Sequence, residues 1–254
     1  MAWDPSQYLA FADLRTRPSH ELIARIALER PESIVDLGCG PGNSTQALRL
    51  RWANADILGV DNSPQMLARA RKDGPDARWL EADLKTWRPA QPVNLVFSNA
   101  TLQWLDGHAQ LFPALMSHVA GGGAFAVQML RNFDAPSHRL LHEVAREGPW
   151  SPRLARKFRE EPVGGPEFYY DLLAPMSLRV DIWETDYLQV MEGEDPVLDW
   201  IKGTALVPVM AALEEPERTH YLDALAARLR AAYPRRGDGK TLFSFRRLFI
   251  IAYR

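Results

Sequence analysis

The residues whose types and spacing could support chemistry begin with a glycine-rich segment, Ile34–Thr45. An apolar run passes through Asp36, and glycines then alternate with other residues at Gly38, Gly40 and Gly42, before a polar helix start. Glycine lets the backbone turn tightly and approach a ligand closely, and the N-terminus of the following helix presents unpaired N–H groups. Such a loop between a strand and a helix favours nucleotide binding, although ordinary turns and helix caps also use glycine.

The glycine spacing disfavours a dinucleotide cofactor. The dinucleotide fingerprint is G-x-G-x-x-G, but Asn43 or Thr45 stands where its third glycine belongs, depending on where the count starts. The loop instead reads Asp-x-Gly-x-Gly-x-Gly and begins at Asp36. This pattern resembles motif I of class I S-adenosyl-L-methionine-dependent methyltransferases. The resemblance implies that Asp36 helps to hold the methionine end of that cofactor.

Two further carboxylates follow the next two apolar segments. Asp61 ends the first, where a carboxylate can accept hydrogen bonds from both ribose hydroxyls, and capping of the next helix is the alternative. The resemblance implies that Asp83 meets the adenine amino group, that the N–H of Leu84 meets a ring nitrogen, and that Met66 packs on the adenine face. Asn99 is assigned to the cofactor as well. A turn aspartate and a core methionine are the alternatives for Asp83 and Met66.

Short apolar runs alternate with helical patterns along the first half of the chain, and these elements would position the residues named above. Such alternation is typical of parallel strands joined by crossover helices. We expect strands at Ser33–Leu37, Asp56–Asp61, Ala77–Glu81, Asn94–Ser98 and Ala124–Met129, and helices at Ser44–Arg51, Pro64–Arg71 and His108–His118. An earlier helix is expected to be capped by Ser19 and stopped by Pro31, after an irregular, aromatic-rich stretch at residues 1–18. Parallel strands end at one edge of a sheet, so the three carboxylates would lie together there.

The alternation ends near residue 147. Residues 147–168 are rich in proline, glycine and charge, and they favour a surface excursion. We then expect a strand at Leu178–Met191, a helical stretch at Asp195–Tyr233 and a last strand at Leu242–Tyr253.

These elements predict one α/β domain over residues 1–254, and the resemblance implies that it has a Rossmann-like class I methyltransferase fold. The sheet would be mostly parallel and flanked by helices, with a helical lid or insertion before the last strand. The expected parts are an N-terminal arm and helix (1–30), a cofactor-binding core (31–146), an excursion (147–177) and C-terminal strands (178–254) with a helical insertion (195–233).

Composition and charge exclude several classes of partner. The 254 residues carry 30 Lys and Arg against 32 Asp and Glu, a net charge of -2, without the basic excess that nucleic-acid binding requires. No apolar run is long enough for a membrane span, and the first residues do not resemble a signal peptide. A lone cysteine, Cys39, excludes an intramolecular disulfide and a cysteine-rich metal site. We therefore expect a cytoplasmic enzyme without a metal, and the composition leaves its oligomeric state open.

Narrower motifs resemble the trans-aconitate methyltransferase family from one end of the chain to the other. They comprise Trp3–Leu9, Phe11, Arg15-x-Arg17-Pro18, the glycine loop, Asn99-Ala100-x-Leu102-Gln103-Trp104-Leu105, Ala126–Met129, Tyr169–Asp171, Val180–Trp183 and Arg247–Ile250. The stretch Gly148–Pro166 departs from the family. The Asn/Asp-Pro-Pro-aromatic motif of amine methylation and the cysteine nucleophile of pyrimidine methylation are both missing. The resemblance implies methyl transfer from S-adenosyl-L-methionine to a small polycarboxylate such as trans-aconitate, which gives a monomethyl ester and S-adenosyl-L-homocysteine.

Such a reaction needs little catalytic machinery. Carboxylic acids are ionised at neutral pH, so no acid or base residue is assigned, and His108 is expected to be an ordinary histidine near a helix start. Proximity and orientation would carry the transfer.

A polycarboxylate does need cations and hydrogen-bond donors around it. The candidates are Tyr8, Arg15, Arg17, Gln128, Tyr169, Tyr170 and Arg247. Each has a solvated or merely packed side chain as its alternative. Two other functions also stay open: a methyltransferase for another small acceptor, such as an amine or phenol, and a non-catalytic cofactor-binding relative.

The glycine spacing generates the first prediction. In calorimetric titrations the protein is expected to bind S-adenosyl-L-methionine and S-adenosyl-L-homocysteine, but not NAD. NAD binding of comparable strength would contradict the cofactor assignment.

Overall fold

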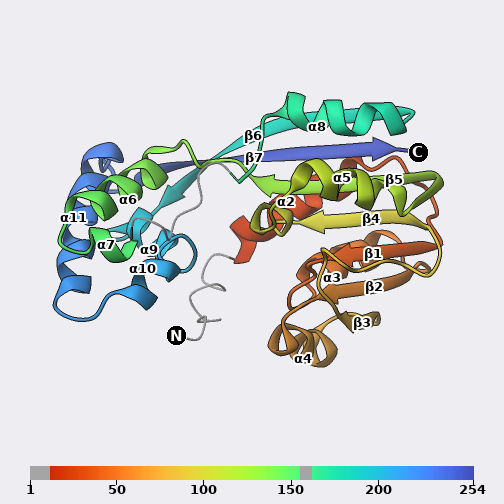
Figure 1. Ribbon diagram of the computed structural model, residues 1–254, viewed down its shortest axis with the longest axis horizontal. Helices are drawn as coiled ribbons and strands as arrows, with labels where there is room; N and C mark the ends of the chain where they lie inside the picture. The colour runs from red at the N-terminus through yellow and green to blue at the C-terminus, as the bar shows by residue number, and fades with distance from the viewer. Residues whose placement is uncertain (1–11, 155–161) are drawn as a thin grey trace. The chain divides into compact units, whose positions relative to one another are not determined.

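The computed structural model describes residues 12–154 and 162–254, with side chains from residue 16 onward (Figure 1). Contacts within the chain divide it into two compact units. The sheet unit comprises Asp13–Leu130, Pro162–Thr185 and Arg247–Arg254, and the helical unit comprises 131–154 and Asp186–Arg246 among the described residues. The single domain expected over residues 1–254 stays a prediction, as does the role of the insertion as a lid.

Seven strands form one sheet in the order β3-β2-β1-β4-β5-β7-β6 (Figure 1). They are β1 (Ser33–Leu37), β2 (Asp56–Asp61), β3 (Arg78–Glu81), β4 (Val93–Asn99), β5 (Val119–Leu130), β6 (Arg179–Met191) and β7 (Thr241–Tyr253). β1 to β5 run parallel, and β7 pairs antiparallel with β5. The predicted Rossmann-like, mostly parallel sheet flanked by helices is confirmed.

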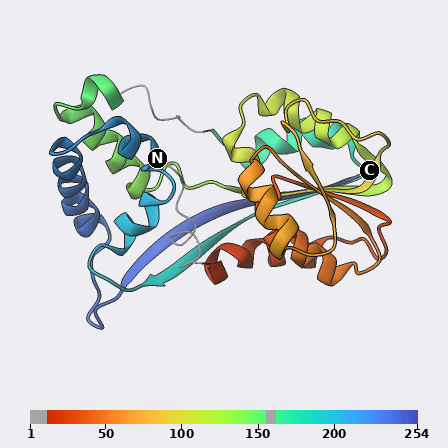
Figure 2. The same ribbon diagram turned by 90° about the horizontal axis from the view of Figure 1, so that it is seen from below.

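Helices cover both faces of the sheet in the sheet unit. They are α2 (Ala12–Arg25), α3 (Asn43–Arg51), α4 (Pro64–Asp73), α5 (His108–Ser117) and α8 (Pro166–Leu173), with short 3-10 turns η1 (Leu102–Trp104) and η2 (Ala174–Met176). Figure 2 shows α5 and α8 on one face and α2 on the opposite face. Phe112 of α5 contacts Phe125 of β5 and Tyr169 of α8, with ring centroids 5.6 and 4.6 Å apart. Because both faces are covered, the middle of β4 and the second half of β5 are buried on both sides.

The helical unit holds α6 (Pro136–Glu147), α7 (Ser151–Leu154), α9 (Pro196–Lys202), α10 (Val207–Ala212) and α11 (Glu217–Ala232). Tyr221 of α11 is fully buried, and its hydroxyl donates to the carbonyl of Leu141 in α6 at 2.9 Å. The helical stretch expected at Asp195–Tyr233 is therefore three helices, and α6 was not anticipated. None of the helices that the structure describes is long and apolar enough to cross a membrane.

Helix α2 differs from the sequence expectation at both ends. The sequence indicates a helix that starts at Ser19 and stops at Pro31, but α2 already begins at Ala12, contains Pro18 and ends at Arg25. Ser19 Oγ donates to the carbonyl of Thr16 at 2.7 Å, so this hydroxyl bonds inside the helix and does not cap it. The prediction of an irregular stretch over residues 1–18 is wrong for residues 12–18, and residues 1–11 lie outside the described part of the chain. Packing of the buried Pro18 outweighs the local cost of an interior proline.

The expected surface excursion, residues 147–168, contains more regular structure than its composition suggests. α7 lies within it and α8 begins at Pro166, while residues 155–161 lie outside the described part of the chain. Gly165 followed by Pro166 is a helix start, because proline at the first helical position loses no hydrogen bond. That signal was present in the sequence and was not used.

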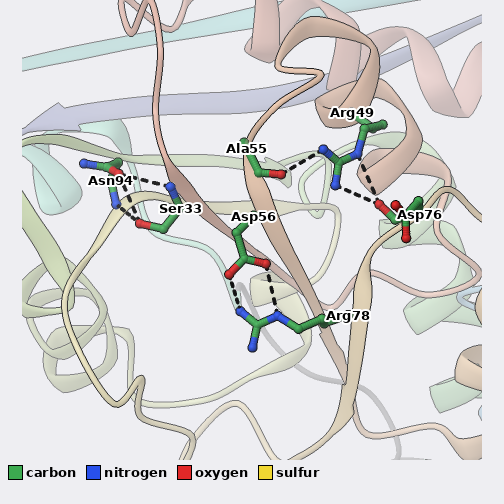
Figure 3. A network of polar contacts seen from close by, with 7 residues as sticks. All are labelled: Ser33, Arg49, Ala55, Asp56, Asp76, Arg78 and Asn94. Carbon is green, nitrogen blue, oxygen red and sulfur yellow. Dashed lines mark hydrogen bonds and ion pairs between the residues drawn. The ribbon is translucent and has the colours of Figure 1, made fainter.

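Side-chain hydrogen bonds connect the strands at their amino ends (Figure 3). Asn94 Oδ1 accepts from the N–H and the hydroxyl of Ser33, both at 3.1 Å, which joins the start of β4 to the start of β1. Arg78 and Asp56 form a two-point ion pair at 3.0 and 2.6 Å between β3 and β2. Arg49 donates to the carbonyl of Ala55 at 2.8 Å and to that of Asp76 at 2.7 Å. These contacts are placed to fix the register of the strands at the edge away from the glycine loop.

Two arginines of this edge generate a stability prediction. Arg49→Ala is expected to lower the free energy of unfolding by about 1–3 kcal/mol, because it leaves several carbonyls without a charged donor. Arg78→Ala is the matched control and is expected to cost less than about 1 kcal/mol, since its ion pair is solvent-exposed. Urea denaturation measures both, and equal losses would show that Arg49 does not bridge the two strand starts.

Candidate active site

The glycine loop follows β1 and is held by two neighbouring segments, the end of β2 and the loop after β4. The N–H of Gly38 donates to the carbonyl of Val60 at 2.7 Å, and the N–H of Gly40 donates to Asp61 Oδ2 at 2.9 Å. Gly38 has a φ of 73°, and a Cβ on it would lie 2.1 Å from the Thr101 side chain. Only glycine therefore fits there, and the loop after β4 packs directly against the loop after β1.

Asp36 is completely buried beneath this loop. Its Oδ2 accepts hydrogen bonds from Ser44 Oγ at 2.7 Å and from Thr45 Oγ1 at 2.6 Å, while its Oδ1 has no partner among the described residues. Burial raises the pKa of this carboxyl from 3.8 to about 6, because the charged form loses its hydration. At neutral pH the group is still ionised, with one buried oxygen available to accept from a ligand. A cationic ligand group such as an ammonium suits this oxygen.

Asp61 stands at the end of β2 and orders the loops around it. Its Oδ2 accepts from Gly40, and its Oδ1 accepts from the N–H of Ser63 at 2.9 Å. The cap of α4 is Ser63, whose Oγ accepts from the N–H of Met66 at 3.3 Å, so the helix cap that Asp61 could have supplied comes from another residue. Each carboxylate oxygen of Asp61 has a further lone pair, which leaves capacity for ribose hydroxyls. The ribose role of Asp61 stays a prediction.

The residues expected to meet adenine follow β3 and begin α4. Asp83 is exposed; its Oδ1 accepts from the N–H of Lys85 at 2.9 Å, as in the turn that was its alternative. Leu84 is buried, and its N–H donates to no group within the described residues. Met66 is half-buried in the first turn of α4. These positions are compatible with an adenine at the ends of β2 and β3, and the assignments stay predictions.

Strand register places four of the predicted residues on one face of the sheet. Asp36 pairs with Phe97 of β4, and Asn99, two residues further on, pairs with Gln128 of β5. Paired residues share a face, and so do residues two apart in a strand. Gln128 in turn pairs with Phe249 of β7, and Arg247 precedes that phenylalanine by two. We call Asp36, Asn99, Gln128 and Arg247 the polar row.

The remaining substrate candidates are not in the polar row. Tyr169 is buried on the opposite face, against α5. Tyr170 is 53% exposed. Arg17 lies on the surface of α2 and pairs with Glu21 at 2.7 Å. Tyr8 and the side chain of Arg15 lie outside the described residues. The substrate roles of all five stay predictions.

Tyr169 and His108 bind each other inside the sheet unit. The Nε2 of His108 is 2.9 Å from the carbonyl of Leu102, so Nε2 must carry the proton, and Nδ1 accepts from the Tyr169 hydroxyl at 2.7 Å. That hydroxyl accepts in turn from the N–H of Gly164 at 3.2 Å. Both ring nitrogens are therefore engaged with the protein, and His108 is poorly placed to act as a general base.

Sequence reasoning missed the residues that support Asp36 and the loop. Ser44 and Thr45 hold its carboxylate, and two adjacent hydroxyls in the first turn of the helix were a usable signal. Thr101 also donates to the carbonyl of Gly38 at 3.1 Å. It follows Ala100, whose φ of 55° is left-handed, and no sequence pattern indicated that turn.

Comparison with known proteins agrees with this geometry. A family model described as "Methyltransferase domain" matches residues 34–123, which include the glycine loop, Asp61 and Asp83. The structure of the YcgJ protein from Bacillus subtilis is similar in fold, with a TM-score of 0.60, 12% identity and coverage of 94% of this chain and 99% of that one. Phosphoethanolamine N-methyltransferase 2 from Haemonchus contortus, solved with S-adenosyl-L-methionine, gives a TM-score of 0.55 at 14% identity, covering 93% of this chain and 52% of that one. The fold and the site define a class I S-adenosyl-L-methionine-dependent methyltransferase.

Two full-length relatives narrow the assignment. The chain is 49% identical over 252 residues to trans-aconitate 2-methyltransferase from Azoarcus sp. (strain BH72), covering 99% of both. It is 46% identical over 252 residues to the protein of that name from Yersinia pestis (strain Pestoides F), covering 99% of this chain and 98% of that one. The chain belongs to the trans-aconitate 2-methyltransferase family.

The buried carboxylate generates a prediction with a definite pH dependence. The pKa of Asp36 is higher in the folded protein than in the unfolded chain, so its contribution to stability is present below about pH 4 and lost as the pH rises through about 6. Asp36→Asn does not titrate. Relative to wild type, it is expected to gain on the order of 2–3 kcal/mol in free energy of unfolding between about pH 4 and pH 7.5.

The same variant is expected to bind S-adenosyl-L-methionine at least about tenfold more weakly at neutral pH, because the amide cannot replace a charged acceptor. Urea denaturation at several pH values and calorimetry measure the two effects. A stability difference that does not change with pH, together with unchanged cofactor affinity, would contradict both the raised pKa and the binding role.

Proposed function

We propose that this enzyme transfers the methyl group of S-adenosyl-L-methionine to one carboxylate of trans-aconitate, which gives the monomethyl ester. The observation that carries the proposal is the 49% identity to a protein named trans-aconitate 2-methyltransferase over 99% of both chains. The chemistry of the polar row supports the proposal, because its groups suit a cationic cofactor and an anionic acceptor placed side by side.

The groups of this chain fit the cofactor at several points. Asp36 Oδ1 and Asn99 Oδ1 are buried oxygens without a partner among the described residues, and both suit the positively charged methionine end. Glycine at positions 38 and 40 suits a close approach of the backbone to the ligand, and the remaining lone pairs of Asp61 suit ribose hydroxyls. Bound S-adenosyl-L-methionine supplies the electrophilic methyl carbon: the new C–O bond forms as the C–S bond breaks, and sulfur keeps the electron pair in S-adenosyl-L-homocysteine.

The protein's part in this reaction is binding and orientation. A carboxylate acceptor has lost its proton well below neutral pH, so no side chain has to remove one. His108 is locked between Leu102 and Tyr169, consistent with a structural role. Cys39 is buried in the glycine loop, and burial raises the pKa of its thiol, which makes it a poor nucleophile. In this proposal the residues of the polar row bind and orient the two reactants.

Two alternatives predict different behaviour. An amine or phenol acceptor must lose a proton and would usually need a base. A non-catalytic relative would bind the cofactor and form no product. Product mass after incubation with a panel of carboxylic acids, amines and phenols separates the three.

The pH profile tests the mechanism directly. With trans-aconitate and saturating cofactor, the single-turnover rate is expected to be nearly flat from about pH 6 to pH 8, since the acceptor is already ionised. His108→Gln should keep this plateau, with circular dichroism as the check that it folds. A rate that climbs about tenfold per pH unit across neutrality and collapses in His108→Gln would indicate a general base and an acceptor of another class.

A further inference from the structure

Three atoms of the polar row are buried and have no hydrogen-bond partner among the described residues. They are Asp36 Oδ1, Asn99 Oδ1 and Gln128 Nε2. The two oxygens can only accept, and they lie on β1 and β4. The amide nitrogen can only donate, and it lies on β5, on the side of the row nearer to Arg247. The row thus changes from acceptors to donors across neighbouring strands.

The orientation of the Gln128 amide is fixed by its neighbour. Arg247 Nη1 donates to Gln128 Oε1 at 3.2 Å. A guanidinium carries donors and no acceptor, so the amide oxygen must face Arg247 and the amide nitrogen must face away from it. The usual ambiguity between the two ends of a glutamine side chain is thereby removed. The free end of Gln128 presents two N–H groups.

Burial makes this arrangement selective. Gln128 is 0% exposed and Arg247 is 3% exposed. A buried donor is costly to leave without an acceptor, and its hydrogen bond to a charged acceptor is stronger than one to a neutral acceptor. A ligand group at this end of the row therefore has to accept hydrogen bonds and is favoured by a negative charge.

The neighbouring strand shows where this ligand group would lie. Gln128 pairs with Asn99, and its carbonyl accepts from the N–H of Ala100 at 2.9 Å. Ala100 begins the turn that brings Thr101 against the glycine loop. Gln128 is therefore adjacent to the cofactor segment and one strand closer to β7.

We infer that Gln128 is a specificity-determining residue that donates both N–H groups to a carboxylate of the acceptor, and that Arg247 is the positioning residue that orients it. The inference rests on the proposed function. Hydrogen bonds and a nearby cation make a carboxylate oxygen less nucleophilic. The carboxylate that Gln128 holds is thus an anchoring one, and a different carboxylate of the same molecule receives the methyl group.

Binding to protein saturated with S-adenosyl-L-homocysteine tests the inference without turnover. Gln128→Glu keeps the size of the side chain and an acceptor for Arg247, but it replaces the two donors with a negative charge. Its affinity for trans-aconitate is expected to fall about 10- to 100-fold, while its affinity for S-adenosyl-L-homocysteine stays within about threefold of wild type. Gln128→Met removes the donors without adding charge and should lose less.

Two further variants act as controls. Arg247→Lys keeps a donor for Gln128 and should retain more acceptor affinity than Arg247→Met. At saturating acceptor the single-turnover rate should change little in any of these variants, so that the effect falls on KM and not on kcat. Gln189→Glu makes the same change at another buried glutamine, on β6, and should leave acceptor affinity unchanged.

The acceptor itself supplies the sharpest comparison. Three dicarboxylates each lack a different carboxylate of trans-aconitate. For one of them the difference in affinity between wild type and Gln128→Glu is expected to shrink towards zero, because the anchored carboxylate is gone. The inference would be overturned if Gln128→Glu lost the same affinity for all three dicarboxylates, or if it bound trans-aconitate as tightly as wild type. A parallel loss of affinity for S-adenosyl-L-homocysteine would overturn it as well.

The outcome for wild type separates this inference from the proposed function. Tight trans-aconitate binding without formation of the methyl ester would refute the proposed reaction. The affinities of wild type and Gln128→Glu would then still decide whether Gln128 anchors the acceptor. Failure of wild type to bind trans-aconitate would refute both.

Discussion

The candidate active site is organised around one carboxylate that is buried away from water. Asp36 lies at the end of β1, fully buried, and takes hydrogen bonds from Ser44 and Thr45 at the start of α3. These bonds join the strand to the helix across the glycine loop and fix the loop between them. They satisfy only one of the two carboxylate oxygens, and burial raises the pKa to about 6. The ionised carboxylate of Asp36 therefore lowers the stability of the fold at neutral pH. A buried charge that is kept in spite of this cost is typical of a binding residue.

From that charge, the polarity of the side chains changes step by step along the polar row. The polar row begins with an anionic group on β1, continues through a neutral oxygen acceptor at Asn99 and an amide donor at Gln128, and ends with a cation at Arg247. A cofactor that carries positive charge and an acceptor that carries negative charge would each meet groups of opposite polarity. Methyl transfer between them neutralises both charges, so a dry site favours the reaction once the reactants are bound. No proton transfer is needed at any point in this scheme.

The amino ends and the carboxyl ends of the strands differ in how fully their polar side chains are hydrogen-bonded. At the amino ends of the strands, side chains such as Asn94 and Arg49 saturate hydrogen bonds between neighbouring segments. At the carboxyl ends, the same kinds of polar atom include several without a partner among the described residues. The left-handed turn at Ala100 and the close contact between Gly38 and Thr101 also lie at that end. Local conformational cost is therefore concentrated where a ligand can compensate for it.

The sequence by itself determined the parts that depend on local pattern. Alternating apolar runs indicated five parallel strands, and the Asp-x-Gly-x-Gly-x-Gly loop placed Asp36, Gly38 and Gly40 at the end of the first. Boundaries were less accurate where packing outweighs local preference, as at Pro18 inside α2. Gly165 and Pro166 did mark a helix start, but the surrounding composition obscured it.

Only the tertiary structure decided which candidates share a face. Gln128 and Tyr169 were equal candidates for the acceptor, yet strand register puts the first beside Asn99, while packing against α5 puts the second on the opposite face. The orientation of the Gln128 amide depends on Arg247, which is 119 residues away in the chain. The physical reason is that a one-residue change of register moves every side chain of a strand to the other face, and register is set by contacts between strands that no local pattern encodes.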